Sequence, residues 1–120
     1  MAAITRFEEI QAWQLARKLT LRIYELTKHQ PFDRDWSLKN QIRDAAGSTM
    51  HNIAEGFDAG SDAEFARFLR YTRRSATEVQ SELYVALDQR YITPQEFSEL
   101  YALAEQCKKA TNGLIRYLSP

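Results

Sequence analysis

The chain has 120 residues, of which 16 are basic and 16 acidic, so its formal net charge is zero. This length suits one domain whose core needs neither a disulfide nor a metal, and the single cysteine, Cys107, excludes an internal disulfide framework. No stretch approaches the roughly 20 apolar residues of a membrane-spanning helix, and charged residues come too early for a signal peptide. We therefore expect one cytoplasmic domain over residues 1–120, with no membrane contact.

Four segments carry the helical repeat of apolar residues, in which spacings of four and three alternate. The first covers about residues 7–28 and stops before Pro31, because proline disfavours helix in the residue that precedes it. The second covers about residues 37–55 and ends at Gly56. The apolar stripes of these two segments are formed by Ala12, Ala16, Leu19, Ile23, Leu26, Leu38, Ile42, Ala45, Ala46, Thr49 and Ile53.

The third segment covers about residues 62–90 and opens with a capping box of Ser61 and Glu64. The fourth covers about residues 94–118, and a second capping box precedes it at Thr93 and Glu96. Their stripes are formed by Phe65, Leu69, Thr72, Ala76, Val79, Leu83, Ala86, Phe97, Leu100, Ala104, Cys107, Thr111, Leu114 and Leu118. Short connections between long helices imply antiparallel neighbours, so the sequence predicts an all-α, up-and-down four-helix bundle.

The first and third segments also carry apolar side chains away from their stripes. A free single chain rarely exposes a contiguous apolar patch, and large aromatics at a surface often anchor an interface. We therefore expect a homo-oligomer, in which the first helix contributes strongly. In the alternative interpretation, Trp13 and Tyr24 only cap the edges of a wide core. The candidate interface residues are Ile10, Trp13, Leu21, Tyr24, Tyr71 and Val85.

One cluster of like charges lies on the third segment, where Arg67, Arg70 and Arg74 share an outward face with Tyr71. Arginines beside an aromatic ring can contact phosphates and stack on a base of RNA. The same cluster also fits a solvated helix face or a contact between subunits. The neutral charge of the whole chain weakens the RNA interpretation.

No pattern in the sequence points to catalysis, a metal or a cofactor. The two histidines, His29 and His51, do not follow a glutamate at the Glu-x-x-His spacing of a di-metal bundle. Cys107 falls on the apolar stripe of the fourth helix, where a cysteine behaves as a small hydrophobe. Phosphate-binding glycine loops and zinc-ligand spacings are also missing from the sequence. We expect a protein that is not an enzyme and that holds no cofactor.

Several short motifs together resemble a known bacterial family. They extend from about Phe7 to Leu118, and the Asn-Ile-Ala-Glu-Gly block followed by Ser-x-x-Glu-Phe is the most specific. The sequence is similar to the four-helix-bundle proteins encoded inside intervening sequences of the 23S ribosomal RNA gene. The motifs are Phe7-Glu8-Glu9-Ile10-x-Ala12-Trp13, Leu38-x-x-Gln41-Ile42-Arg43-x-Ala45-Ala46, Asn52-Ile53-Ala54-Glu55-Gly56, Ser61-x-x-Glu64-Phe65-x-x-Phe68-Leu69, Ser75-x-x-Glu78 and Asn112-Gly113-Leu114-Ile115.

The resemblance implies an up-and-down bundle that assembles into a ring-shaped homo-pentamer without an established enzyme activity. A relative of that family is the accessory protein of diversity-generating retroelements, a basic pentamer that engages nucleic acid and a reverse transcriptase. This chain lacks that basic excess, and it reads Ser48-Thr49-Met50-His51 where many members read Ser-Ile-Pro-Ser. It also has Phe57-Asp58-Ala59-Gly60 where basic residues often follow the motif glycine, and Arg74 where a small residue is common.

The motif residues that we expect to act structurally lie at the helix ends and on the third helix. Asn52 and Glu55 fall in the last turns of the second helix and are expected to bond across the following loop. Glu78 is expected to point outward near Arg74 and to pair within or between subunits. The full set is Asn52, Glu55, Gly56, Ser61, Glu64, Ser75 and Glu78.

The sequence therefore favours a non-enzymatic, homo-oligomeric assembly protein that binds itself and either a protein or an RNA partner. The alternative is an RNA-binding accessory factor associated with ribosomal RNA intervening sequences or with a reverse transcriptase. Phosphate contacts give an affinity that falls as salt rises, so a salt titration separates the two.

Overall fold

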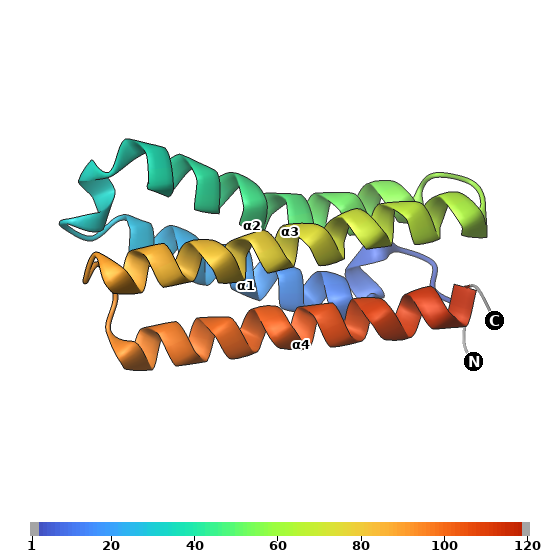
Figure 1. The fold of residues 1–120 in the computed structure, drawn as a ribbon. Coiled ribbons are helices and arrows are strands. Elements are labelled where there is room, and N and C mark those ends of the chain that lie inside the picture. Colours follow the sequence, from blue (N-terminus) through green and yellow to red (C-terminus); the bar gives the residue numbers. More distant parts are fainter. Residues whose placement is uncertain (1–2, 119–120) are drawn as a thin grey trace.

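The computed structural model describes residues 3–118, and within that range it contains four α-helices and no strand. They are α1 (Gln11–Thr27), α2 (Trp36–Phe57), α3 (Asp62–Asp88) and α4 (Pro94–Leu118), and they lie along one long axis (Figure 1). Each helix packs against its neighbours in the chain, and α1 also packs against α4, which closes the bundle. The predicted all-α, up-and-down four-helix bundle is confirmed, with overall dimensions of 45 × 22 × 19 Å.

The start of the chain differs from the single helix predicted over residues 7–28. A 3₁₀ turn, Phe7–Glu9, comes first. Ile10 follows it with an extended backbone, at φ −76° and ψ 122°, and separates this turn from α1. A second 3₁₀ turn, Phe32–Arg34, lies between α1 and α2. The second helix extends beyond the predicted range at both ends, whereas α3 ends two residues early at Asp88.

Three of the helices begin at side chains that accept hydrogen bonds from free backbone N–H groups. Asp35 Oδ1 accepts from Leu38 N at 3.1 Å at the start of α2, and Ser61 Oγ accepts from Glu64 N at 3.2 Å at the start of α3. Before α4, Thr93 Oγ1 accepts from Glu96 N at 3.1 Å while Glu96 Oε1 accepts from Thr93 N at 2.8 Å. The box at Thr93 is therefore reciprocal, and each such cap stabilises its helix by about 1 kcal/mol.

The core follows the predicted stripes. Large side chains such as Leu19, Ile23 and Leu83 are fully buried, and each contributes roughly 1.5–3 kcal/mol through burial of apolar surface. Buried threonines satisfy their hydroxyls on backbone carbonyls: Thr72 Oγ1 donates to Thr49 O of the neighbouring helix at 2.9 Å. The stripe residues thus both exclude water and tie α2 to α3.

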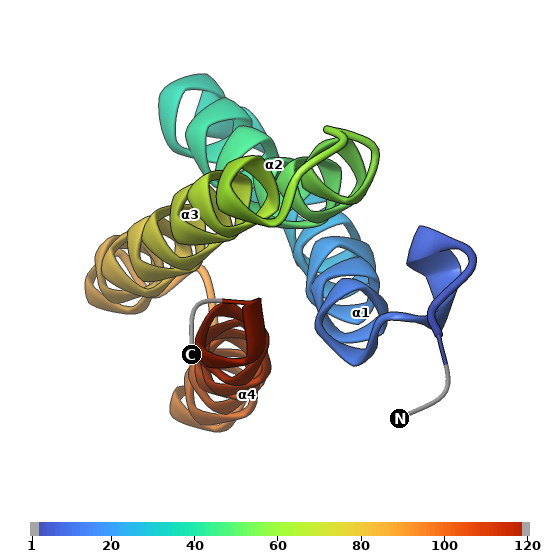
Figure 2. The ribbon, with the colours of Figure 1, turned by 90° about the vertical axis from the view of Figure 1, so that its right-hand side faces the viewer.

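Both termini and the α2–α3 loop lie at one end of the bundle, and the other two connections lie at the opposite end (Figure 1). In the view from the end that carries the termini, α1 and α4 lie next to each other on the side of the bundle away from the α2–α3 loop (Figure 2). Two cavities open there, whereas the middle of the bundle is closed by the core.

Candidate binding surfaces

The arginine cluster of α3 is held by contacts within its own helix. Arg67 Nη2 forms an ion pair with Glu64 Oε2 at 2.8 Å, and Arg67 Nη1 donates to the Tyr71 hydroxyl at 2.9 Å. The guanidinium of Arg74 lies 5.9 Å from the centre of the Tyr71 ring. The structure therefore brings Arg67, Tyr71 and Arg74 together as predicted, with Arg70 exposed on the same helix, but Arg67 already has an anionic partner.

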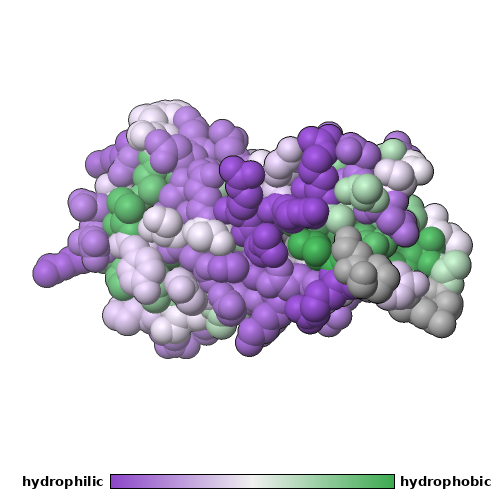
Figure 3. All heavy atoms as spheres, turned by 45° about the vertical axis from the view of Figure 1, so that its right-hand side comes forward, coloured by the Kyte–Doolittle hydropathy of each residue, from purple (hydrophilic) through white to green (hydrophobic). Residues whose placement is uncertain are grey.

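A groove between α3 and α4 brings Lys108 beside Arg73 and Arg74, which the sequence did not predict. It has a volume of about 420 Å³ and is lined by Arg73, Arg74, Thr77 and Lys108. Arg73 Nη1 donates to Asn112 Oδ1 at 2.9 Å, and Lys108 Nζ donates to Gln80 Oε1 at 3.1 Å. On the face drawn in Figure 3, hydrophilic residues cover the middle of the molecule, and hydrophobic residues are exposed towards both of its ends.

An aromatic cluster joins the same two helices nearer to their connecting loop. The Tyr84 ring of α3 lies 4.8 Å from the Phe97 ring and 6.0 Å from the Tyr101 ring of α4, measured between centroids. Tyr84 keeps 51% of its surface exposed, so one side of this cluster faces solvent. Sequence reasoning missed Tyr84, although its spacing of seven residues from Thr77 places both on one face of α3.

The outer surface of α1 and α2 exposes large apolar side chains, as the sequence predicts for Leu21 and Tyr24. Their exposed fractions are 61% and 39%, and Trp36, which the sequence did not single out, is exposed at 68%. The Arg43 guanidinium of α2 lies 4.5 Å from the centre of the Tyr24 ring and links the two helices. We call these four residues the α1–α2 aromatic surface.

The remaining candidate interface residues divide between core and surface. Ile10 is only 3% exposed, so its predicted position on an outer face is wrong, because it precedes α1 and packs into the core from an extended backbone. Trp13 is half-buried and packs edge-on against Phe7, with ring centroids 5.2 Å apart. Tyr71 is half-buried as well, whereas Val85 is exposed at 45%.

Three carboxylates lie together between α2 and α3, which we call the acidic face. Glu82 is only 7% exposed, and its Oε1 atom is buried without a hydrogen-bond partner. The pKa of Glu82 is raised to about 8, mainly because burial disfavours its charged form and also because the carboxylates of Glu78 and Asp44 lie nearby. Within residues 3–118 no ion pair joins Glu78 to Arg74, so the expected intramolecular pairing is not observed.

The family-motif residues lie mainly at the end of α2 and the start of α3. Asn52 donates to Ser48 O at 2.9 Å along its own helix, and so it does not bond across the loop as expected. Glu64 contacts Arg67 and does not complete a reciprocal box with Ser61. Glu55 is exposed, Ser75 is half-buried, and Gly56 is buried where α2 meets α3.

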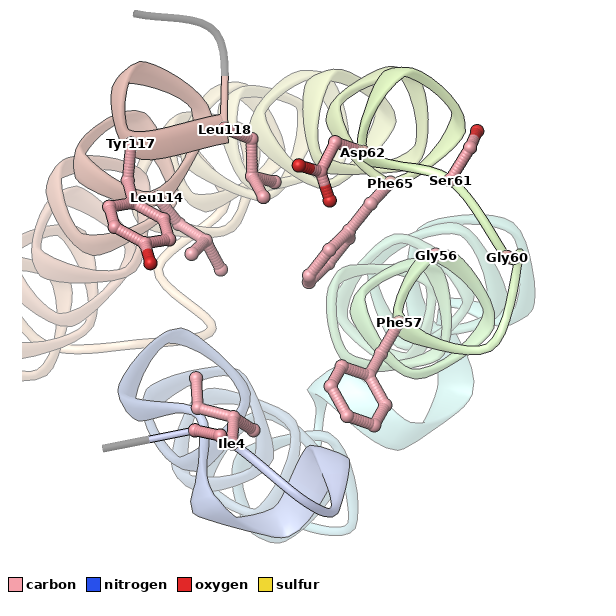
Figure 4. Close-up of a pocket in the computed structure, with 11 residues that line it drawn as sticks. Ile4, Gly56, Phe57, Gly60, Ser61, Asp62, Phe65, Leu114, Tyr117 and Leu118 are labelled. Atoms are coloured by element: carbon pink, nitrogen blue, oxygen red, sulfur yellow. The ribbon is translucent and has the colours of Figure 1, made fainter. Parts of the chain in front are cut away.

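A cavity of about 390 Å³ opens at the end of the bundle that carries the termini (Figure 4). The side chains of Phe65, Leu114 and Leu118 point into it, and the carboxylate of Asp62 enters from the start of α3. A neighbouring cavity of about 390 Å³ lies between α1 and α4 and shares Ile4, Leu114 and Tyr117. The walls of both cavities are mainly apolar, and their polar lining comes from the start of α3 in the first and from Glu9 and Gln11 in the second.

The described part of the chain contains no group of three or more His, Cys, Asp or Glu side chains arranged to hold a metal ion. Cys107 is fully buried, and burial raises the pKa of its thiol to about 11. None of the helices in residues 3–118 has the length and apolar content to cross a membrane.

The chain is thus a small four-helix bundle that exposes charged and aromatic surfaces. The chain matches the family described as 23S rRNA-intervening sequence protein over residues 8–113, and it therefore belongs to that family. Its fold is similar to the crystal structure of a protein of unknown function from the S23 ribosomal protein family of Bacteroides thetaiotaomicron. The TM-score is 0.77 at 20% sequence identity, covering 91% of this chain and 99% of the other. No curated protein matches the sequence.

Proposed function

We propose that this protein is a non-catalytic assembly protein whose copies associate into a homo-oligomer that acts by binding a partner. The α1–α2 aromatic surface carries this proposal. Leu21 and Trp36 expose 61% and 68% of their area, and Tyr24, three residues after Leu21 on α1, exposes 39%. Exposed aromatic and aliphatic side chains gathered over two neighbouring helices are typical of an interface, because burying them removes apolar area from water.

The occupant that we propose for this surface is the acidic face of a second copy. The aromatic surface carries cations, since Arg43 lies over the Tyr24 ring and Lys39 Nζ lies 3.8 Å from the Trp36 ring centre. The acidic face has the opposite charge, because Glu78 and Asp44 are exposed beside the buried Glu82. A cation from the neighbouring copy would pair with these exposed carboxylates in charge-assisted hydrogen bonds.

Contact between two different surfaces of identical chains is heterologous, and it forms a closed ring when the rotation between copies closes. The resemblance to the intervening-sequence proteins implies a ring of five. The neutral net charge is compatible with self-association, since strong mutual repulsion between copies is absent.

The state of Cys107 supports binding without catalysis. A thiol reacts as a nucleophile through its thiolate form. With its pKa raised to about 11 and no exposed surface, the Cys107 thiol stays protonated and out of reach of a substrate near neutral pH.

The test is the solution mass of the purified chain, measured by sedimentation velocity and light scattering. We expect the wild-type protein to have the solution mass of an oligomer of several chains. The double variant Leu21→Ser, Tyr24→Ser should have the mass of one folded chain. Tyr117→Ser is the matched control, because Tyr117 is 60% exposed but lies on α4 at the terminal end. A wild-type protein that sediments as one folded chain at micromolar concentration would overturn the proposal.

The second candidate function is that of an RNA-binding accessory factor. One observation favours it: basic side chains from two helices meet in a single groove although the chain as a whole is neutral. A local basic groove of this kind is the electrostatic feature that phosphate groups require.

A further inference from the structure

The groove between α3 and α4 has the charge and the donors of a phosphate site. Arg73, Arg74 and Lys108 bring three positive charges to one open hollow, and Thr77, whose hydroxyl donates to the Arg73 carbonyl oxygen at 3.2 Å, completes its lining. Like charges held this close repel one another, and a bound anion would relieve that repulsion. Arginine offers five N–H donors in a planar fork that matches phosphate oxygens. The charge and the N–H donors of this groove therefore match those that an oxyanion such as phosphate needs.

Two of these cations are already positioned before any ligand arrives. Arg73 is held by Asn112 at 2.9 Å and Lys108 by Gln80 at 3.1 Å, and each contact occupies only one of the available donors. Less side-chain freedom is then lost on binding, which favours affinity. Glu105 Oε1 lies 3.9 Å from Lys108 Nζ and accepts from Gln80 at 3.0 Å, so a carboxylate marks the edge of the anion site towards Tyr101.

Beyond that edge, an aromatic platform continues the same face. Tyr84 follows Thr77 by two helical turns, which is about 10 Å along α3. Its ring is supported from behind by Phe97 and Tyr101 of α4 while half of its area faces solvent. A rigid exposed ring beside a basic groove is the arrangement on which unpaired bases stack, and stacking contributes about 1–3 kcal/mol per base.

We propose that this groove binds the phosphodiester backbone of single-stranded RNA at Arg73, Arg74 and Lys108, with a nearby base stacked on Tyr84. The inference rests on the second candidate function and gives it a site. In a duplex the bases are paired and stacked inside the helix, so Tyr84 has no free base face to contact. The groove should therefore prefer single strands to duplex RNA.

The experiment measures binding of a fluorescein-labelled oligouridylate of about twelve nucleotides, followed by fluorescence anisotropy across a range of NaCl concentrations. We expect saturable binding that weakens as salt rises. The variant Arg73→Gln, Lys108→Gln should bind about tenfold more weakly at low salt, and the magnitude of its log–log salt slope should fall by about 1.4, since each phosphate contact to a single strand contributes about 0.7. Its matched control is Arg17→Gln, Lys18→Gln, which removes two exposed cations from α1 and should bind nearly as the wild type does.

A second pair of variants tests the aromatic platform. Tyr84→Ala should weaken binding about tenfold with an unchanged salt slope, whereas Tyr84→Phe keeps the ring and should retain wild-type affinity. A duplex of the same length should bind more weakly than the single strand. All variants are compared at equal helical content and equal solution mass, so that unfolding or altered assembly is not mistaken for lost binding.

The results separate the site from the function. Saturable RNA binding that responds equally to the groove variant and to the α1 control overturns the groove as the site and leaves the second candidate function standing. Equal affinity for duplex and single strand, or a Tyr84→Ala variant that binds as the wild type does, overturns the stacking contact. Binding of inorganic phosphate without binding of the oligonucleotide, or no saturable binding at low salt, overturns the inference and the second candidate function together.

Discussion

Gly56 at the end of α2 lies so close to Phe68 of α3 that a Cβ atom added at Gly56 would come within 2.7 Å of the Phe68 Cβ. The ring of Phe65 would lie 3.0 Å away and the Phe65 carbonyl oxygen 3.3 Å away. Backbone and Cβ atoms cannot rotate out of such a contact. The glycine is therefore required by the close approach of the two helices just before their connecting loop, and this accounts for its place in the family motif.

The first prediction follows from that contact. Gly56→Ala should lower the free energy of unfolding by about 1–3 kcal/mol, because α2 and α3 must move apart to admit the methyl group. Urea denaturation followed by far-ultraviolet circular dichroism measures the change.

Gly113 provides the matched control for Gly56. It lies within α4, and the nearest atom that an added Cβ would meet is Arg116 Nη2 at 4.0 Å. Gly113→Ala should therefore raise the free energy of unfolding by about 0.5–1 kcal/mol, through the lower backbone entropy of alanine in the unfolded chain. Equal destabilisation by the two substitutions would contradict the steric explanation.

The fold could be predicted almost completely from the sequence because bundle helices are specified by local signals. The alternating spacing of apolar residues gives the buried side of each helix, and the caps at Ser61 and Thr93 give the starts of α3 and α4. The break at Ile10 could not be predicted in the same way. Its side chain is buried by packing against other elements, and a helical wheel of α1 contains no information about that packing.

The binding surfaces were less accessible to sequence reasoning because they combine residues from two helices. The register between α3 and α4 brings Lys108 beside Arg73 and Thr77, and that register is a property of the packed bundle. The same limit applies to Glu82, whose burial depends on the position of α2 relative to α3. Trp36 was missed because it is the first residue of α2, where no preceding helical turn shows which face of the helix the residue occupies.

The second prediction concerns the pH dependence of stability, which Glu82 should dominate. Its pKa of about 8 in the folded chain lies above its ordinary value of 4.5, so the folded chain holds one more proton between these values. The free energy of unfolding should therefore fall as pH rises from about 4.5 to 8, by at most about 1.4 kcal/mol per pH unit, and level off above. Glu82→Gln should flatten this slope and be more stable than its parent at pH 9.

The measurement is best made in the Leu21→Ser, Tyr24→Ser background, which we expect to remain a single chain. A cation from a neighbouring copy would otherwise stabilise the charged form of Glu82 and reduce the slope. Glu25→Gln is the control, since it makes the same chemical change at an exposed position of α1 and should keep the parental pH profile. A Glu82→Gln variant with the parental slope would show that another group causes the dependence.

The third prediction concerns the reactivity of Cys107. The thiol has no exposed surface, its Sγ lies 3.8 Å from the Ala12 carbonyl oxygen, and its pKa is raised to about 11 by burial. Iodoacetamide at pH 8 should therefore leave the folded chain unmodified while it alkylates the urea-unfolded chain completely. Intact-mass spectrometry gives an unambiguous result, because Cys107 is the only cysteine.

Replacing the same residue separates its structural contribution from any chemical role. Cys107→Ala should lower the free energy of unfolding by about 1 kcal/mol, since a small cavity replaces a buried sulfur atom. The solution mass and the RNA affinity of the variant should remain those of the wild type, because the sulfur is buried against α1 and lines neither the α1–α2 aromatic surface nor the α3–α4 groove. Rapid stoichiometric alkylation of the folded chain would show an accessible thiolate, and the argument from Cys107 against catalysis would then fail.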